Sequence, residues 1–277
     1  MSIKEPDYLQ IWQDLTTRGH GWFSLKFNHQ DKARAYDIAS RKKNLGRRDV
    51  LLDFVKQQLK PEDTAIDIGA GTGRWTIPLA GVVSKVTAIE PAKSMYDILI
   101  RNAEAAGIAS KIHLISDTWE NAQVEKHDIV ACFHAMYMSA DFRAFIHKIE
   151  SHARKYCYLG IRHFPIDGII QELGEKIHGN RHDSPNFIIA YNALYQMGIY
   201  ANVFMEDLRQ TWTDTTLEDA FARAKRHLNL LDDSTHDELV RMTLERRLVF
   251  QDGLYHWPDS MSTALVWWKV DENKVGE

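Results

Sequence analysis

Cysteine and long apolar runs are both scarce in this chain of 277 residues. The two cysteines, Cys132 and Cys157, each lie inside an apolar run typical of a buried strand, so we interpret them as reduced core thiols. No window reaches the roughly 20 apolar residues that a membrane-spanning helix needs. The first ten residues also lack the apolar core of a secretory signal. The sequence therefore predicts a cytoplasmic protein that does not bind membranes.

The chain also has no large excess of either charge. It has 34 lysines and arginines against 38 acidic residues, a formal net charge of -4. Proteins that bind a nucleic-acid backbone usually concentrate positive charge, and the basic run at residues 41–48 is too short to bind a duplex. We therefore expect a small-molecule substrate and no nucleic-acid partner.

The usual spacing of metal ligands is missing as well. Of the 13 histidines, His178 and His182 have the four-residue spacing of helical ligands. Gly179 and Asn180 between them disfavour the helix, and no cysteine pair or acidic cluster completes a site. The sequence predicts no metal site.

From residue 64 onward, short β-rich runs alternate with helical segments. The runs that we predict as strands are TAIDI, VTAIE, KIHLI, DIVACF and YCYLGI, followed by GIYANVFME and STALVWWKV. The last run has the continuous apolar character of a strand that is buried on both faces. This order predicts an α/β, doubly wound, mostly parallel seven-stranded sheet with helices on both faces.

Changes of pattern divide the chain into four expected regions. They are an N-terminal helical leader at 1–60, a Rossmann-like cofactor-binding core at 61–165, a substrate or lid region with strand six at 166–262, and a final core strand and tail at 263–277. The third region would be a helical lid insertion between the last strands. Two of its helices are predicted to begin at the capping boxes Thr215–Glu218 and Thr235–Glu238.

A glycine-rich loop follows the first predicted strand in the stretch AIDIGAGTG, residues 65–73. Glycines permit a tight turn and a close approach of the backbone to a ligand. A dinucleotide site would have G-x-G-x-x-G, but the last position of that motif is Arg74 or Thr76, depending on the first glycine counted. Glu90 ends the second strand, where nucleoside-binding folds place an acid for the ribose hydroxyls. Together these features predict a nucleoside-containing cofactor other than NAD.

Residues 61–163 resemble the class I S-adenosylmethionine-dependent methyltransferases, through AIDIGAGTGRWTIPLA as the first motif and VTAIEPAKSM as the second. The resemblance implies that S-adenosylmethionine is the cofactor and S-adenosylhomocysteine the product. It also implies roles for single residues. The loop residues Gly69, Ala70, Gly71 and Gly73 would lie against the methionine part, Asp67 would order the loop, Glu90 would bind the ribose, and Pro91 would lie beside the adenine.

The third and fourth strands resemble further parts of the family's cofactor site. In KIHLISDTWE, Asp117 would bind the adenine amino group, with Thr118 and Trp119 beside the ring. The alternative is that Asp117 caps a turn and Trp119 fills a surface groove. In HDIVACFHAMYMS, Phe133 and His134 would lie under the methionine and face the substrate.

The expected activity is methyl transfer to a small-molecule acceptor by in-line displacement, with no obligatory nucleophilic residue. The chain has no N-P-P-Y or D-P-P-Y tetrapeptide after strand four, which disfavours methylation of base amino groups. If the acceptor must lose a proton, the candidate bases are His134, Tyr137 and His163. Two alternatives stay open: a non-catalytic S-adenosylmethionine-binding regulator or partner subunit, and, ranked third, a nicotinamide oxidoreductase. The acceptor and the oligomeric state also stay open.

Overall fold

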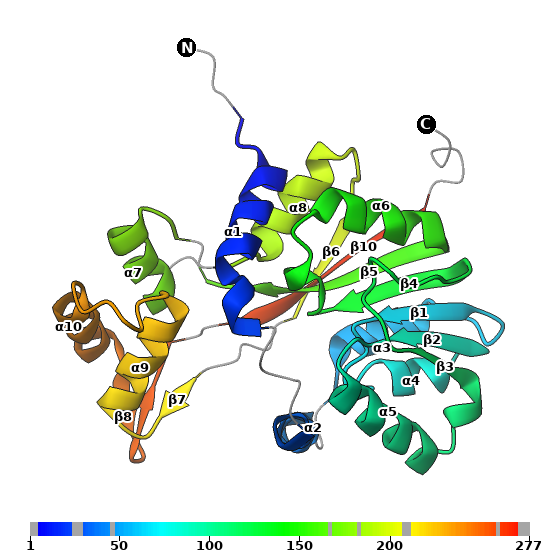
Figure 1. Ribbon diagram of the computed structural model, residues 1–277, viewed down its shortest axis with the longest axis horizontal. Helices are drawn as coiled ribbons and strands as arrows, with labels where there is room; N and C mark the ends of the chain where they lie inside the picture. Colours follow the sequence, from blue (N-terminus) through cyan, green and yellow to red (C-terminus); the bar gives the residue numbers. More distant parts are fainter. Residues whose placement is uncertain are drawn as a thin grey trace. The chain divides into compact units, whose positions relative to one another are not determined.

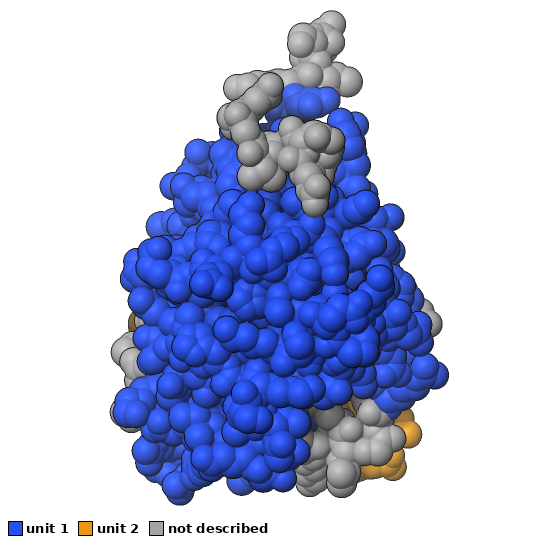
Figure 2. All heavy atoms as spheres, turned by 90° about the vertical axis from the view of Figure 1, so that its right-hand side faces the viewer, with its two compact units in different colours: residues 1–161, 189–204, 264–277 blue, residues 162–188, 205–263 orange. Residues whose placement is uncertain are grey.

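The computed structural model describes residues 5–23, 30–44, 48–165, 168–181, 184–206, 212–258 and 261–270. His182 and part of the basic run at 41–48 lie outside the described residues. The chain divides into two compact units, which are coloured separately in Figure 2. Unit 1 comprises Met1–Ile161, Ile189–Phe204 and Ala264–Glu277, and unit 2 comprises Arg162–Ile188 and Met205–Thr263.

Unit 1 is built on a seven-stranded sheet with the strand order β3-β2-β1-β4-β5-β10-β6 (Figure 1). The strands are β1 Thr64–Ile68, β2 Lys85–Ile89, β3 Ile112–Ile115, β4 His127–Phe133, β5 Ala153–His163, β6 Asn202–Met205 and β10 Ser262–Lys269. The pairs from β3 to β5 are all parallel. The predicted α/β, mostly parallel seven-stranded fold is confirmed, with a strand in each of the seven predicted runs.

Helices cover both faces of this sheet. The helices α4 and α5 lie on one face, and α6 and α8 lie on the other (Figure 1). Their bounds, with those of the remaining helices of unit 1, are α1 Tyr8–Phe23, α2 Gln30–Asn44, α3 Val50–Gln57, α4 Thr76–Ala80, α5 Lys93–Ala105, η1 Ala109–Lys111, η2 Met136–Met138, α6 Phe142–His152 and α8 Phe187–Gln196. Within this unit α1 packs against α6 and η2, and α2 packs against α5.

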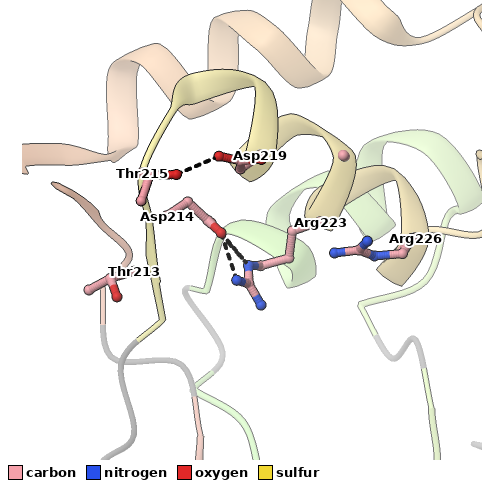
Figure 3. A pocket seen from close by; sticks show the side chains of 7 residues that line it. Thr213, Asp214, Thr215, Asp219, Arg223 and Arg226 are labelled. Atoms are coloured by element: carbon pink, nitrogen blue, oxygen red, sulfur yellow. Dashed lines mark hydrogen bonds and ion pairs between the residues drawn. The ribbon is translucent and has the colours of Figure 1, made fainter. Parts of the chain in front are cut away.

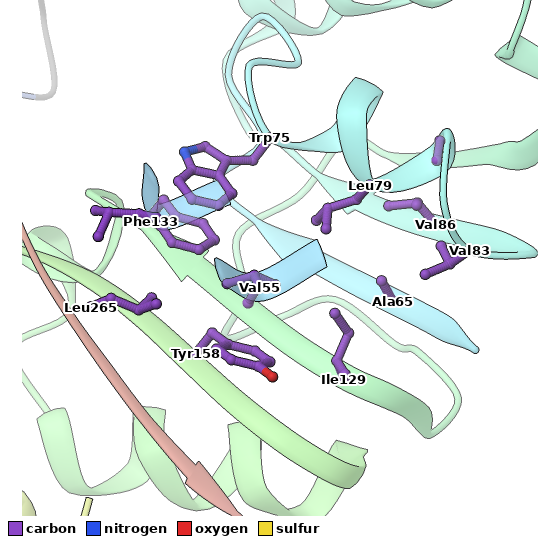
Figure 4. Close-up of a cluster of buried hydrophobic side chains, with 13 residues drawn as sticks. Val55, Ala65, Trp75, Leu79, Val83, Val86, Ile129, Phe133, Tyr158 and Leu265 are labelled. Atoms are coloured by element: carbon purple, nitrogen blue, oxygen red, sulfur yellow. The ribbon is translucent and has the colours of Figure 1, made fainter. Parts of the chain in front are cut away.

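Burial on both faces explains the continuous apolar runs of the central strands. Val55 of α3, Leu79 of α4 and Ile129 of β4 are fully buried in one cluster, and Tyr158 of β5 lies in the same cluster (Figure 4). Burying an aliphatic side chain of this size stabilises a fold by about 1.5–3 kcal/mol relative to exposure. The core therefore fixes the strands whose ends carry the predicted cofactor residues.

The described residues of unit 2 form three helices and a small antiparallel sheet. These elements are α7 Ile169–His178, α9 Leu217–His227, α10 Asp237–Arg247, β7 Thr213–Asp214, β8 Val249–Gln251 and β9 Leu254–His256. We did not predict the sheet, because strands of two or three residues are too short to show alternation. The sequence nevertheless contains a hairpin signal, the dipeptide Asp252-Gly253. The two residues have φ values of 51° and 78°, as a two-residue turn between strands requires.

The predicted helix starts in unit 2 are each wrong by one residue. The N-caps are Thr216 and His236 and not Thr215 and Thr235. The Thr216 hydroxyl accepts a hydrogen bond from the Asp219 N–H at 3.0 Å and donates to the Asp219 carboxylate at 2.7 Å. Asp219 therefore takes the place in the capping box that the sequence pattern assigned to Glu218.

We predict that Thr216→Ala lowers the free energy of unfolding by about 1 kcal/mol, because it removes the acceptor for an N-terminal N–H of α9. Thr215→Ala is the matched control, since its hydroxyl donates to the exposed carboxylate of Asp219. Its effect should be smaller. Urea denaturation of both variants measures the difference, and a larger loss for Thr215→Ala would contradict the assigned cap.

Candidate functional site

The predicted cofactor residues lie where three neighbouring parallel strands of unit 1 end. The last residue of β1, Ile68, lies opposite Ile89 of β2 and Cys132 of β4. The glycine loop, Glu90 and the segment that begins at Phe133 therefore start at one edge of the sheet. In open α/β sheets this edge is the usual place for a ligand.

The three glycines of the loop have different reasons to be glycine. All have positive φ: 71° at Gly69, 57° at Gly71 and 94° at Gly73. A Cβ on Gly69 would lie 2.1 Å from the Cβ of Ala135, and one on Gly73 would lie 3.0 Å from Cδ1 of Ile77. A Cβ on Gly71 would meet nothing within 4 Å. Gly69 and Gly73 thus permit close packing, whereas Gly71 faces open space that a ligand can use.

Glu90 connects the glycine loop to the segment after β2. Its side chain is buried, its Oε2 accepts the N–H of Gly71 at 2.8 Å, and its Oε1 accepts the N–H of Ala92 at 2.8 Å. Burial raises the pKa of Glu90, and the two backbone hydrogen bonds oppose that change. Each carboxylate oxygen can accept more than one hydrogen bond, so the group retains capacity for ribose hydroxyls.

Asp67 joins β1 to the helix that follows the loop. It is buried, and its Oδ2 accepts a hydrogen bond from the hydroxyl of Thr76, the first residue of α4, at 2.6 Å. Burial raises the pKa of Asp67 to about 7; the Thr76 hydrogen bond opposes the shift, and the negative charge of Glu90 adds to it. The contact is compatible with the predicted role of Asp67 in ordering the loop.

At the end of β4, Phe133 is part of the core and His134 begins the turn. The Phe133 ring stacks on Trp75 with centroids 3.5 Å apart (Figure 4). His134 has a φ of 57°, a left-handed conformation that is uncommon for a residue other than glycine. Its Nδ1 lies 3.1 Å from the hydroxyl oxygen of the buried Tyr137. Whether Phe133 and His134 contact the cofactor stays a prediction.

The residues after β3 are divided between a turn and the core. Asp117 Oδ1 accepts the N–H of Thr118 at 2.8 Å, as in the alternative in which it caps a turn. Trp119 is buried, and Lys148 of α6 places its Nζ 4.8 Å from the ring centroid. Trp119 thus packs against α6 and does not fill an exposed groove. Pro91, after β2, is exposed. Their contacts with adenine stay predictions.

The candidate bases belong to two units. His134 and Tyr137 lie in unit 1, and His163, the last residue of β5, is assigned to unit 2. Nδ1 of His163 lies 3.3 Å from the hydroxyl oxygen of Ser262, and its ring meets the edge of Phe187. The structure therefore brings His134 and Tyr137 together within one unit.

Unit 2 contains a surface pocket that the sequence did not indicate. It has a volume of about 370 Å³ and is lined by residues of β7 and α9 (Figure 3). Arg223 donates to both carboxylate oxygens of the buried Asp214, at 2.6–3.1 Å, and the indole of Trp257 donates to the same carboxylate at 2.8 Å. These contacts join α9 to the small sheet, which is a structural role.

Two properties hold for the residues that the structure describes. No group of three or more His, Cys, Asp or Glu residues among them is placed to hold a metal ion. None of the helices in these residues is long and apolar enough to cross a membrane.

Comparisons with known proteins agree with the geometry. Residues 65–155, which contain the glycine loop, all but the first residue of β1 and strands β2 to β4, match the family model of a methyltransferase domain. An uncharacterized protein of Haemophilus influenzae is 27% identical over 223 residues, which are 77% of this chain and 78% of that protein. The YcgJ protein of Bacillus subtilis has a similar structure, with a TM-score of 0.55, 15% identity and coverage of 80% of this chain and 98% of its own. A putative methyltransferase of Bacillus halodurans has a TM-score of 0.51, 14% identity and coverage of 79% and 96%.

We predict that folded-state stability depends on pH through Asp67. Its pKa is about 7 in the folded protein against the usual 3.8, so the folded state binds the proton more tightly. The free energy of unfolding should therefore fall as the pH rises from about 4 to about 7, because ionisation is favoured in the unfolded chain. Asp67→Asn should weaken this decline in denaturation curves recorded across that range. An identical decline in both proteins would contradict the raised pKa.

A second pair of variants separates packing from binding in the glycine loop. Gly69→Ala should destabilise the fold by 1 kcal/mol or more, on the order of the cost of overpacking, because its Cβ would collide with Ala135. Gly71→Val should abolish cofactor binding, since its side chain fills the open space, and its backbone should also be strained at the positive φ of this position. Thermal unfolding and calorimetry distinguish the two effects, with Gly81→Ala as control. Normal binding by Gly71→Val would show that the loop is only a turn.

Proposed function

We propose that residues 65–155, which match the family model of a methyltransferase domain, bind S-adenosylmethionine, and that the chain transfers a methyl group from it to a small-molecule acceptor. The observation that carries the proposal is the open space at Gly71 beside the buried carboxylate of Glu90. Both lie at the carboxyl ends of adjacent parallel strands. The positive φ of Gly71 favours glycine in any turn, and the open side of this glycine next to a buried acid leaves room for a ligand at that position.

The residues at this edge fit the proposed cofactor. A ribose offers two neighbouring hydroxyl donors, and Glu90 offers a carboxylate held in place by two backbone N–H groups. Gly71 would allow the cofactor to approach the backbone closely. Asp67 would support the loop through Thr76 without touching the cofactor.

The cofactor supplies a methyl group on a sulfonium, which is a good leaving group. The protein's main task would then be to hold the acceptor atom in line with that methyl group, which can provide ~7–11 kcal/mol of the acceleration. If the acceptor carries a proton, His134 would take it, with Tyr137 fixing the rotation of the imidazole ring. Such a base contributes about 10²- to 10⁴-fold.

A small acceptor is favoured over a nucleic acid by two features. Lysine and arginine do not outnumber the acidic residues, so the overall charge does not attract a phosphate backbone. The segment after β4 reads His134-Ala135-Met136-Tyr137 and lacks the tetrapeptide of the enzymes that methylate base amino groups.

The binding test is calorimetry with S-adenosylhomocysteine, S-adenosylmethionine and NADH. We expect the two sulfur compounds to bind and NADH not to bind. Glu90→Ala should weaken their binding by about 1–3 kcal/mol, because it removes a charged acceptor from a buried site. Glu104→Ala, an exposed acid on α5, is the control and should bind normally. Unchanged affinity of a folded Glu90→Ala variant would refute the ribose assignment.

Turnover separates an enzyme from a non-catalytic cofactor-binding protein. Methyl transfer from labelled S-adenosylmethionine would be measured with a panel of metabolites and, as a separate arm, with total RNA. Transfer to a metabolite supports the proposal. Transfer to RNA alone would overturn the choice of a small acceptor, and binding without any transfer would favour the regulator.

A further inference from the structure

We propose that Trp12, in the N-terminal helix α1, is a positioning residue of the methyl-transfer site. It holds the turn after β4 and thereby sets the orientation of Tyr137 and His134. This inference rests on the proposed function, in which His134 takes a proton from the acceptor and Tyr137 fixes the rotation of the His134 ring. The inference connects the site with helix α1, although Trp12 lies 127 positions before Ser139 in the sequence.

Trp12 contacts the turn after β4 in two places and the start of α6 in one. Its side chain is fully buried, and its Nε1 donates to the carbonyl oxygen of Ser139 at 2.8 Å. Its ring lies 4.3 Å from the ring of Phe142, at the start of α6, and 6.4 Å from that of Tyr137, nearly parallel to the latter. The indole therefore connects the end of the turn at Ser139 with Tyr137 inside it.

The start of α1 is fixed independently of Trp12. The side chain of Gln196, at the end of α8, accepts the N–H of Tyr8 at 2.9 Å and donates to the carbonyl of Pro6 at 2.7 Å. Leu15, one turn after Trp12, is also buried. Because α1 is held at its start and at Leu15, the position of the Trp12 side chain next to the turn is fixed.

The other side of the turn meets the glycine loop. The N–H of His134 donates to the carbonyl of Gly160 in β5 at 2.9 Å. Ala135, which follows His134, packs directly against Gly69. Between these contacts His134 keeps its φ of 57°, a conformation that costs on the order of 1–2 kcal/mol outside glycine. Such strain persists where the surroundings enforce it, and it gathers at functional sites. The glycine loop and Trp12 are therefore the two supports of the His134–Tyr137 pair.

The orientation of the imidazole depends on this arrangement. The contact of 3.1 Å between His134 Nδ1 and the Tyr137 hydroxyl fixes the rotation of the ring. Tyr137 itself packs against Trp12. A loss of Trp12 should therefore reach His134 through Tyr137, although Trp12 would touch neither acceptor nor cofactor.

The test follows the ring-nitrogen resonance of His134 by ¹⁵N NMR, assigned by its absence in His134→Gln. Tyr137→Phe removes the hydroxyl and should shift the Nδ1 resonance. Trp12→Phe keeps a ring but removes the indole N–H, and should shift the same resonance in the same direction. The matched control is Trp268→Phe, another buried tryptophan of unit 1, whose Nε1 donates to Glu150 at 3.0 Å. It should leave His134 unchanged.

Three results would overturn the proposal: no shift in a folded Trp12→Phe protein, no shift in Tyr137→Phe, or an equal shift in Trp268→Phe. If Trp12→Phe fails to fold, Phe142→Leu is the second variant. It keeps the Trp12–Ser139 hydrogen bond but loosens the ring contact, so a smaller shift than in Tyr137→Phe is expected, and no shift would refute the coupling.

Affinity for S-adenosylhomocysteine separates this inference from the proposed function. Trp12→Phe should bind it within about twofold of the wild type, since Trp12 does not line the glycine loop. Wild-type protein that does not bind it would refute the proposed function, whereas the NMR result does not depend on the cofactor. With the acceptor identified, Trp12→Phe should lower kcat while leaving KM for S-adenosylmethionine unchanged.

Discussion

The two hydrogen bonds that the Glu90 carboxylate accepts hold the proposed cofactor edge together. One comes from Gly71 in the loop after β1 and the other from Ala92 at the start of α5, so a single side chain links two consecutive strand–helix connections. A carboxylate that is removed from water must find such partners, because an unpaired buried charge costs several kcal/mol. The loop therefore cannot relax away from Glu90 without leaving that group unsatisfied. The positive φ values of the loop are compatible with this constraint only because its residues are glycines.

A second buried acid makes the local charge at this edge adjustable. Burial and the negative charge of Glu90 both raise the pKa of Asp67, and both carboxyl groups are buried. Near neutral pH Asp67 can therefore hold or release a proton in response to the charge of an approaching ligand. A cationic ligand favours the ionised form of both groups. The edge is in this sense matched electrostatically to the positively charged cofactor that we propose, and less well matched to its neutral product.

The sequence predicted those parts of the molecule in which one local pattern had one structural outcome. The central strands were visible because burial on both faces leaves a continuous apolar run, and the loop was visible because glycine and a terminal acid occur at fixed places. The small sheet of unit 2 was missed, since β7 has only two residues. The capping box was placed one residue too early because Thr215–Glu218 and Thr216–Asp219 have the same spacing, and the second pair forms the cap. The left-handed conformation of His134 and the bond from Trp12 to Ser139 have no local signal at all, because they arise from tertiary contacts.

The position of β10 between β5 and β6 has a consequence for the order in which the sheet can form. When β6 leaves the ribosome it has no neighbour, because the strand that separates it from β5 is made almost sixty residues later. Until then the edges of β5 and β6 both expose unpaired backbone groups, and an exposed edge of this kind can pair with another chain. Synthesis of the intervening residues delays closure further, and contacts between distant segments form slowly. The newly made chain is thus most vulnerable to aggregation just before its last strand is inserted, and a chaperone that shields apolar edges would act in that interval.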